Sequence, residues 1–283
     1  MGILIGLVVT LGCVLGGFMA MGGHVNVLIQ PWEAVIICGA ALGTFLVANP
    51  IATVKDTGKG VLEAFKQAVP KERDYLETLG VLHSLMRELR TKSRSEVEAH
   101  IDNPDESSIF QVFPTVLKNH DLTHFICDYC RIIIIGNARS HEIEALMDEE
   151  IQTIRTDKLK IYHALVAVGD GLPALGIVAA VLGVVKTMAA IDQPPAILGE
   201  MIGSALVGTF LGVLLAYGFV GPFANRARQV IEGDSAIYHV VKQIIIASLH
   251  GHPLPLVIEA ARSSIAHANQ PAFADVFDGM RAR

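Results

Sequence analysis

Residues 201–225 read MIGSALVGTFLGVLLAYGFVGPFAN and carry no charged side chain. A helix needs about 20 apolar residues to cross the hydrocarbon core of a bilayer, and this stretch supplies them. Similar uncharged runs occur at 1–31, 34–54 and 171–185. A β-barrel is excluded, because its strands alternate in polarity and never stay apolar this long. The sequence therefore predicts an all-α membrane protein with four transmembrane helices.

The overall composition agrees with this interpretation. Hydrophobic residues make up 52% of the chain and charged residues only 18%, whereas soluble domains average about 25% charged residues. An entirely soluble protein is excluded. The net charge of -6 gives no sign of nucleic-acid binding, which requires a basic surface.

The distribution of lysine and arginine predicts the orientation of the helices. Of 22 such residues, 15 lie between Lys55 and Lys160 and six lie from Arg226 onward, while the connections 22–31 and 189–199 have none. Positive charge is retained on the cytoplasmic side, so we expect both long segments and both termini to be cytoplasmic. The N-terminus lacks the basic leader and the cleavage site of a signal peptide, which indicates a multi-pass protein of the bacterial inner membrane.

Helical spacing of apolar residues continues between the second and third spans, where Leu79, Leu82 and Met86 share one face. We therefore expect a helical cytoplasmic domain inserted there. The expected segments are transmembrane helices 1 and 2 (1–54), the cytoplasmic helical domain (55–160), transmembrane helices 3 and 4 (161–225) and a cytoplasmic C-terminal helical segment (226–283). The chain has no Walker loop, no dinucleotide fingerprint and no nucleophile–base signature, so we expect neither an enzyme nor a cofactor.

Cys127 and Cys130 form a C-x-x-C pair in the inserted domain. Such a pair can be redox-active or supply half of a zinc site. No second pair accompanies it, which favours two small apolar residues on one helix face and predicts no metal site.

A basic stripe with acidic neighbours also lies in the inserted domain. Arg87, Arg90 and Arg94 follow at helical spacing, and Glu96 and Glu98 come directly after them. Such a run is either a solvated helix surface or a docking face that steers a charged partner. Composition alone does not decide between the two.

Polar and helix-breaking residues mark the third and fourth spans, expected at 168–190 and 200–222. Asp170 and Pro173 lie near the inner end of the third span, and Pro222 lies near the inner end of the fourth. At 1.5 Å per residue, Ala180 and Thr209 should meet near mid-membrane and the two prolines should lie at similar depth. A matched pair of prolines is either a hinge or two tolerated kinks.

No aspartate, glutamate or histidine is expected in the middle of any span, although intramembrane ionisable residues mark proton relays. Asp170 lies near the inner boundary, and Lys186 and Glu200 lie near the outer one. The first two spans carry glycine pairs for helix packing, and we expect them to be supporting helices. The proton-carrying carboxylate should therefore come from another chain.

Long collinear stretches resemble the flagellar stator family of MotA, which belongs to the wider group of TolQ- and ExbB-like energisers. The resemblance runs from the glycine-rich first span through Gln30-Pro31 and the segment 101–107, and it is strongest at 141–151, 168–185 and 205–222. TolQ- and ExbB-like proteins resemble only the last two spans closely and have three spans. They supply the alternative hypothesis, a proton-motive-force energiser of an envelope complex. A passive membrane scaffold, whose small residues only pack helices, is a further alternative hypothesis.

The resemblance implies a mechanism and a set of partners. Five copies would surround the helices of a MotB-type dimer, whose single aspartate carries the ion and so supplies the missing carboxylate. Pro173 and Pro222 would couple the channel to the cytoplasmic domain, and Arg90 and Glu98 would contact the rotor protein FliG and transmit torque. Asp170, Ala180 and Thr209 would line the channel.

The resemblance also bears on the choice of ion. Sodium-driven relatives place a hydroxyl where this chain has Ala180, beside Thr209. A sodium ion needs several oxygen ligands, whereas a proton needs only a carboxylate and a chain of water molecules. We therefore expect proton transport.

Overall fold

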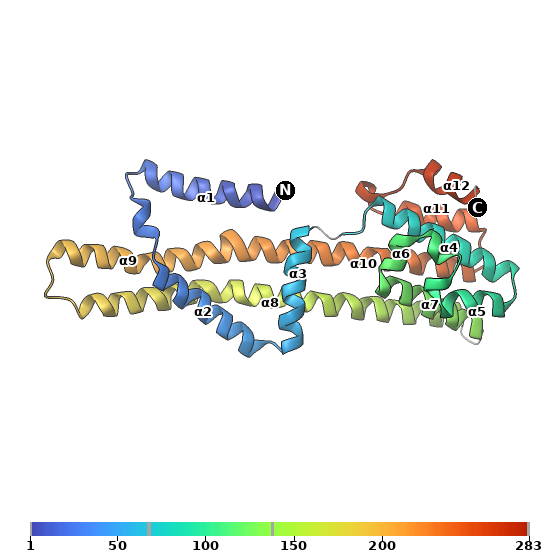
Figure 1. Ribbon diagram of the computed structural model, residues 1–283, viewed down its shortest axis with the longest axis horizontal. Helices are drawn as coiled ribbons and strands as arrows, with labels where there is room; N and C mark the ends of the chain where they lie inside the picture. The colour runs from blue at the N-terminus through green and yellow to red at the C-terminus, as the bar shows by residue number, and fades with distance from the viewer. Residues whose placement is uncertain (1, 67–68, 137–138, 282–283) are drawn as a thin grey trace. The chain divides into compact units, whose positions relative to one another are not determined.

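The computed structural model describes residues 2–66, 69–136 and 139–281. Throughout these ranges the regular elements are helices, with no strand. The helices form two compact units, and each is described by itself: 1–68 with 158–230, and 69–157 with 231–283. Figure 1 shows the order of the elements along the chain.

The first unit contains the apolar helices. They include α1 (Gly2–Ala20), the 3₁₀ turn η1 (Val25–Leu28) and α2 (Pro31–Ala48). The part of α8 (Ser140–Met188) from residue 158 onward, which contains its apolar stretch, also belongs to this unit. A continuous helical run follows, made of α9 (Pro195–Val213), the π-helical segment η4 (Leu214–Val220) and α10 (Gly221–Leu249). Four stretches of the described chain are long and apolar enough to cross a membrane, which confirms the expected set of four apolar helices.

The amphipathic helix α3 (Ile51–Lys66) follows α2 and belongs to the same unit. Its Gly60 lies against the side chain of Ile161. Near its end, the ring of Phe65 packs 4.8 Å from that of Phe223. These contacts attach α3 to the helices that cross the membrane.

The second unit is a helical bundle with one apolar core. Its helices are α4 (Glu72–Thr91), α5 (Arg94–Asp102), α6 (Pro114–Lys118), α7 (His120–Ile135), α11 (Leu254–Ser264) and α12 (Phe273–Arg281), joined by the first part of α8 and the last part of α10. Three 3₁₀ turns connect them: η2 (Pro104–Glu106), η3 (Phe110–Val112) and η5 (His267–Asn269). The predicted apolar face of α4, with Leu79, Leu82 and Met86, is buried in the core.

The C-terminal helices complete this core. Ile237, Val241 and Ile245 of α10 are buried in the same cluster as the face of α4. The compact unit therefore combines part of the expected inserted domain with most of the segment 226–283, and its N-terminal boundary falls after α3 instead of at residue 55. The physical reason is that α10 carries an apolar face of its own, which is buried in the same core as the face of α4. Residues 282–283, at the end of that segment, lie outside the described part of the chain, as does Met1.

The two cysteines of the C-x-x-C pair lie in α7 as free thiols within the core. Burial raises the pKa of the Cys127 thiol to about 12, and burial also raises the pKa of Cys130. A thiol must ionise to act as a nucleophile or metal ligand, so both side chains serve as apolar core residues. This agrees with the interpretation that the sequence favoured.

One carboxylate holds the start of α6 against α4. Glu77 accepts a hydrogen bond from the backbone N–H of Thr115 at 2.7 Å and another from Nε of Arg73 at 2.9 Å. Burial by itself raises the pKa of the Glu77 carboxyl, but these hydrogen bonds outweigh it and the net pKa is lowered. The ionised form of Glu77 is therefore the one that the fold stabilises.

Candidate functional site

The centre of the first unit is a close crossing of α8 and α9. A Cβ on Gly176 would lie 2.7 Å from the carbonyl oxygen of Gly208, and one on Gly212 would lie 2.7 Å from that of Leu172. Neither site has room for a side chain, so the two backbones touch. This is the arrangement that small residues permit between membrane helices.

The two residues expected to meet near mid-membrane lie on this crossing. Ala180 is buried on α8, and its backbone nitrogen lies 3.1 Å from where a Cβ on Gly208 would stand. Thr209 is the next residue on α9 and is half-buried. The structure thus brings Ala180 and the Gly208–Thr209 segment together.

A carboxylate of α2 also reaches this crossing. Glu33 of α2 is 8% exposed, and its Oε2 lies 3.2 Å from the Cβ position of Gly208. Within the described chain, Oε2 of Glu33 has no hydrogen-bond partner. The expectation that no aspartate, glutamate or histidine lies in the middle of a span overlooked Glu33, which belongs to the apolar stretch Val25–Ala48 and reaches this crossing.

The error has a simple geometric origin. The apolar segment starts at Val25, before Glu33, and α2 packs directly on α9. The neighbouring Trp32 is 79% exposed and fits an interfacial anchor, but Glu33 points the other way, into the helix pair. The burial of Glu33 could have been predicted from helical spacing. The buried face of α2 consists of every fourth residue, namely Glu33, Ile37 and Ala41.

Asp170 lies near one end of the α8–α9 pair and does not join Ala180 and Thr209. Its side chain is exposed on α8, three residues before Pro173. Lys186 and Glu200 are exposed toward the other end. These three charges therefore flank the crossing, and Glu33 is the carboxylate at its centre.

The two prolines occupy different local structures. Pro173 lies inside α8, whereas Pro222 is the second residue of α10, directly after the π-helical segment η4. Proline has no N–H to donate to the preceding turn, and π-helical turns inside α-helices occur frequently at functional sites. The helix therefore changes its hydrogen-bonding pattern at Pro222 while remaining continuous.

The expectation of equal depth for the prolines is not met. Gly212 lies against Leu172, next to Pro173, whereas Val220, two residues before Pro222, lies against Gly169. Pro222 is therefore at least about one helical turn, or 5.4 Å, beyond Pro173 along the pair. The same register holds before η4 and at its end, since Gly183 lies against Ala205 and Gly169 lies against Val220. The expectation was inconsistent with the count itself, because a match of Ala180 with Thr209 places residue 216, and not Pro222, opposite Pro173.

Arg90 and Glu98, in the second unit, differ in what they contact. The Nη2 of Arg90 donates to the carbonyl oxygens of Ser248 at 3.2 Å and His252 at 2.7 Å, which attaches α4 to the C-terminal end of α10. Glu98 on α5 is exposed, and no hydrogen bond or ion pair to another described residue involves it. Of the two predicted rotor contacts, Arg90 is therefore held by hydrogen bonds within the chain, whereas Glu98 has no such bond among the described residues.

The neighbouring charges have local structural roles. Glu96 accepts hydrogen bonds from the backbone N–H of Ser93 at 3.0 Å and from its hydroxyl at 2.7 Å, which caps the start of α5. Lys92 pairs with Glu88 at 2.7 Å. Arg94 lies beside Gly136, whose φ of +82° ends α7 in the left-handed conformation.

Comparison with known proteins covers nearly the whole chain. Residues 4–93 match the motility protein A N-terminal family and residues 111–239 match the MotA/TolQ/ExbB proton channel family. The motility protein A of Salmonella typhimurium is 41% identical over 99% of this chain and 95% of its own length, and that of Escherichia coli gives the same values. The chemotaxis protein LafT of Vibrio parahaemolyticus is 33% identical over 95% of this chain and 94% of its own length.

Solved structures show the same fold. The C. jejuni MotAB structure aligns with a TM-score of 0.74 at 16% identity and covers 94% of this chain and 96% of its own. The flagellar MotAB stator complex from Bacillus subtilis aligns with a TM-score of 0.70 at 20% identity, covering 91% and 92%. Together with the full-length relatives, these matches show that the chain belongs to the motility protein A family, within the MotA/TolQ/ExbB proton channel family.

Proposed function

We propose that this chain is the channel subunit of a flagellar stator, which converts ion flow across the inner membrane into torque on the rotor. The observation that carries the proposal is the 41% identity to motility protein A over 99% of the chain. The α8–α9 crossing, with Ala180, Thr209 and Glu33, is the region in which we place the ion path.

In this proposal the protein is a multi-pass protein of the inner membrane with both termini in the cytoplasm. The distribution of cations supports the orientation, because 15 of 22 lie between Lys55 and Lys160 and six lie from Arg226 onward. The segments 55–160 and 226–283 then face the rotor on the same side of the membrane.

The ion path requires a second chain. Solved relatives are described as MotAB complexes, and we propose a MotB-type partner whose aspartate carries the ion past Ala180 and Thr209. Glu33 would place a second carboxyl group beside that path, where a titratable group can exchange a proton with it. The transported ion is the proton, since Ala180 offers no hydroxyl where a sodium ion would need oxygen ligands.

The assembly we propose is a ring of five copies around a MotB-type dimer. Glycines of α1 and α2 support this, because a Cβ on Gly12, Gly16, Gly39 or Gly43 would have no neighbouring atom within 4 Å. Such small-residue faces let another helix approach closely. They are available for a partner chain.

Torque would pass through the second unit to a FliG-type rotor protein. Glu98 offers an exposed carboxylate, and Arg90 places part of a guanidinium at the surface while holding the end of α10. Pro173 and the η4–Pro222 segment are the positions at which α8 and the α9–α10 run could bend during each ion passage.

The test is complementation of a swimmer that lacks its own stators. This chain is expressed with a MotB-type partner, and motility is scored with and without sodium. We expect swimming that persists without sodium and requires the partner. Correct membrane insertion without swimming would reject the stator function and favour an ExbB/TolQ-type energiser or a passive scaffold, whereas swimming that requires sodium would reject the proton assignment alone.

A further inference from the structure

A cavity of about 520 Å³ lies between the start of α1 and the junction of η4 with α10. This volume falls within the range of about 300–1,000 Å³ that small-molecule sites occupy. All of its lining residues belong to the first unit. Most of the wall is apolar and is formed by Ile3, Leu7, Leu165, Val220 and Phe223.

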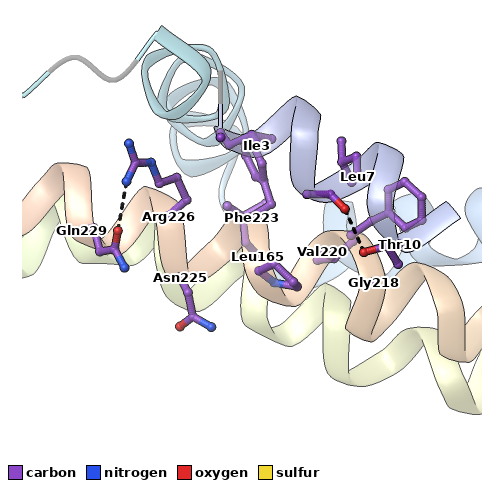
Figure 2. Close-up of a pocket in the computed structure, with 14 residues that line it drawn as sticks. Ile3, Leu7, Thr10, Leu165, Gly218, Val220, Phe223, Asn225, Arg226 and Gln229 are labelled. Atoms are coloured by element: carbon purple, nitrogen blue, oxygen red, sulfur yellow. Dashed lines mark hydrogen bonds between the residues drawn. The ribbon is translucent and has the colours of Figure 1, made fainter. Parts of the chain in front are cut away.

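One end of the cavity is polar and cationic. Figure 2 shows Arg226 and Gln229 of α10 at this end, and Leu7 and Thr10 of α1 toward the other. Nη1 of Arg226 donates to Oε1 of Gln229 at 3.1 Å. The Nε of Arg226 is shielded from solvent and has no hydrogen-bond acceptor among the described residues. A shielded donor on a charged group normally has a partner, so the site is suited to an additional anionic oxygen.

The two ends of the cavity match the two zones of a bilayer. Residues 201–225 carry no charge and Arg226 is the first cation after them, so Arg226 lies where the span ends. The lining residues of α1 lie within an uncharged run. The apolar end is therefore at the depth of acyl chains, and the basic end is at the depth of headgroups.

We propose that this cavity binds one anionic phospholipid, with its phosphate at Arg226 and Gln229 and an acyl chain along the groove between α1 and η4. Basic pockets between membrane helices on the cytoplasmic side bind anionic headgroups, and the apolar wall accounts for the rest of the cavity, which a free phosphate would leave unfilled. The proposal goes beyond the stator function. It depends on membrane insertion and not on torque.

The experiment is native mass spectrometry of the full chain, purified with its partner and stripped of lipid by detergent. Phosphatidylglycerol or phosphatidylcholine is then added back. We expect the native protein to bind phosphatidylglycerol in preference to phosphatidylcholine. Arg226→Gln should weaken phosphatidylglycerol binding about tenfold, the effect of losing one charge-assisted hydrogen bond, and Arg226→Lys should weaken it less because it keeps the charge.

Arg228→Gln is the matched control, because it removes the same charge two residues away. The Arg228 guanidinium lies over the ring of Tyr162 at 5.6 Å and does not line the cavity. We expect this variant to bind phosphatidylglycerol as the native chain does. Equal losses in the Arg226 and Arg228 variants would overturn the proposal, because they would indicate only the general attraction of anionic lipid to a basic surface.

A second variant tests the acyl groove without touching the charge. Gly6 lines the cavity and a Cβ on it would have no atom within 4 Å, so Gly6→Leu places a side chain in the cavity, whereas Val8→Leu changes an exposed position of the same helix outside the lining. We expect Gly6→Leu, but not Val8→Leu, to reduce lipid binding at least several-fold. Unchanged lipid binding in Gly6→Leu would overturn the proposal, as would loss of assembly without loss of lipid, which would place a second copy of the chain in the cavity.

Inorganic phosphate distinguishes a lipid site from a simple anion site. It is added as competitor at a concentration far above that of the lipid. We expect phosphatidylglycerol to remain bound, because burial of its acyl chain adds to its binding and inorganic phosphate has no such chain. Displacement of the lipid by phosphate alone would contradict the proposal.

Discussion

The glycines of α8 and α9 and those of α1 and α2 look alike in sequence but differ in the structure. At Gly176 and Gly212 an added Cβ would meet backbone atoms of the opposite helix at 2.7 Å, whereas at Gly12 and Gly39 it would meet nothing within 4 Å. Gly176 and Gly212 complete a contact within the chain. Gly12 and Gly39 are left open, so the same residue type serves internal packing in one region and assembly in the other.

The largest effect should come from filling the closed crossing. Gly212→Ala forces a methyl group against the carbonyl oxygen of Leu172, and overpacking of this kind costs about 1–3 kcal/mol. We expect a lower unfolding temperature in detergent and loss of swimming. Gly12→Ala is the control and should leave the unfolding temperature unchanged or slightly raised, because alanine favours a helix over glycine. Equal destabilisation in both variants would remove the distinction between the two regions.

Glu33 connects the two regions, because it lies on α2 and its carboxylate reaches the crossing at Gly208. Glu33→Gln keeps the size of the side chain and removes its titratable carboxyl group. We expect motors that assemble normally but rotate more slowly, measured by the rotation of beads attached to filaments. The control is Trp32→Phe, one residue away and exposed, which should rotate at the native speed. Native speed in Glu33→Gln would exclude a role for the Glu33 carboxyl group in the ion path.

Arg90 and Glu98 show the same difference among charged residues. Arg90 is hydrogen-bonded within the chain, whereas Glu98 is not bonded to another described residue. Arg90→Ala removes hydrogen bonds to the carbonyls of Ser248 and His252 and should destabilise the second unit by about 1 kcal/mol, reduced from the usual value because the group is exposed. Glu98→Ala should change stability by less than about 0.5 kcal/mol. Both should lower torque.

The measurement pairs thermal unfolding with torque from stalled or loaded beads. Loss of torque in Glu98→Ala with unchanged unfolding would assign Glu98 to rotor contact alone. If Glu98→Ala destabilised the chain as much as Arg90→Ala, the described difference between the two residues would be incorrect.

The smallest effect concerns the acid stability of the second unit. Because the pKa of Glu77 is lowered in the fold from its ordinary value of 4.5, its contribution to stability is present above that value and is lost as pH falls through the folded pKa. We expect Glu77→Gln to be less stable than the native chain at neutral pH by a few tenths of a kcal/mol to about 1 kcal/mol. The difference should shrink in acid. Unfolding temperatures of both proteins measured from pH 7 to pH 3 provide the check. A stability difference between Glu77→Gln and the native chain that grows in acid would contradict the lowered pKa of Glu77.

The sequence predicted the helices well, because the spacing of apolar residues and the length of apolar runs determine where helices form. The four apolar helices and the buried face of α4 follow from length and spacing alone. The pairing of the C-terminal helices with the inserted domain did not follow, since an amphipathic face indicates that something covers it without identifying the partner.

The site was predicted only in part. Counting residues predicted that Ala180 and Thr209 meet, and the structure places Ala180 against Gly208, the residue before Thr209. Glu33 was missed, because its side chain direction depends on how α2 packs against α9. The depth of Pro222 was also missed, although the match of Ala180 with Thr209 already places Pro222 about six residues beyond the position opposite Pro173.

The most direct test of the account concerns the source of the ion-carrying carboxylate. Rotation is measured on beads in a stator-deleted cell that expresses this chain with its MotB-type partner, either native, with the transmembrane aspartate of the partner changed to asparagine, or with Glu33→Gln in this chain. We predict that the asparagine variant of the partner stops rotation completely, while Glu33→Gln only slows it. Sustained rotation without the partner's carboxylate would contradict the account.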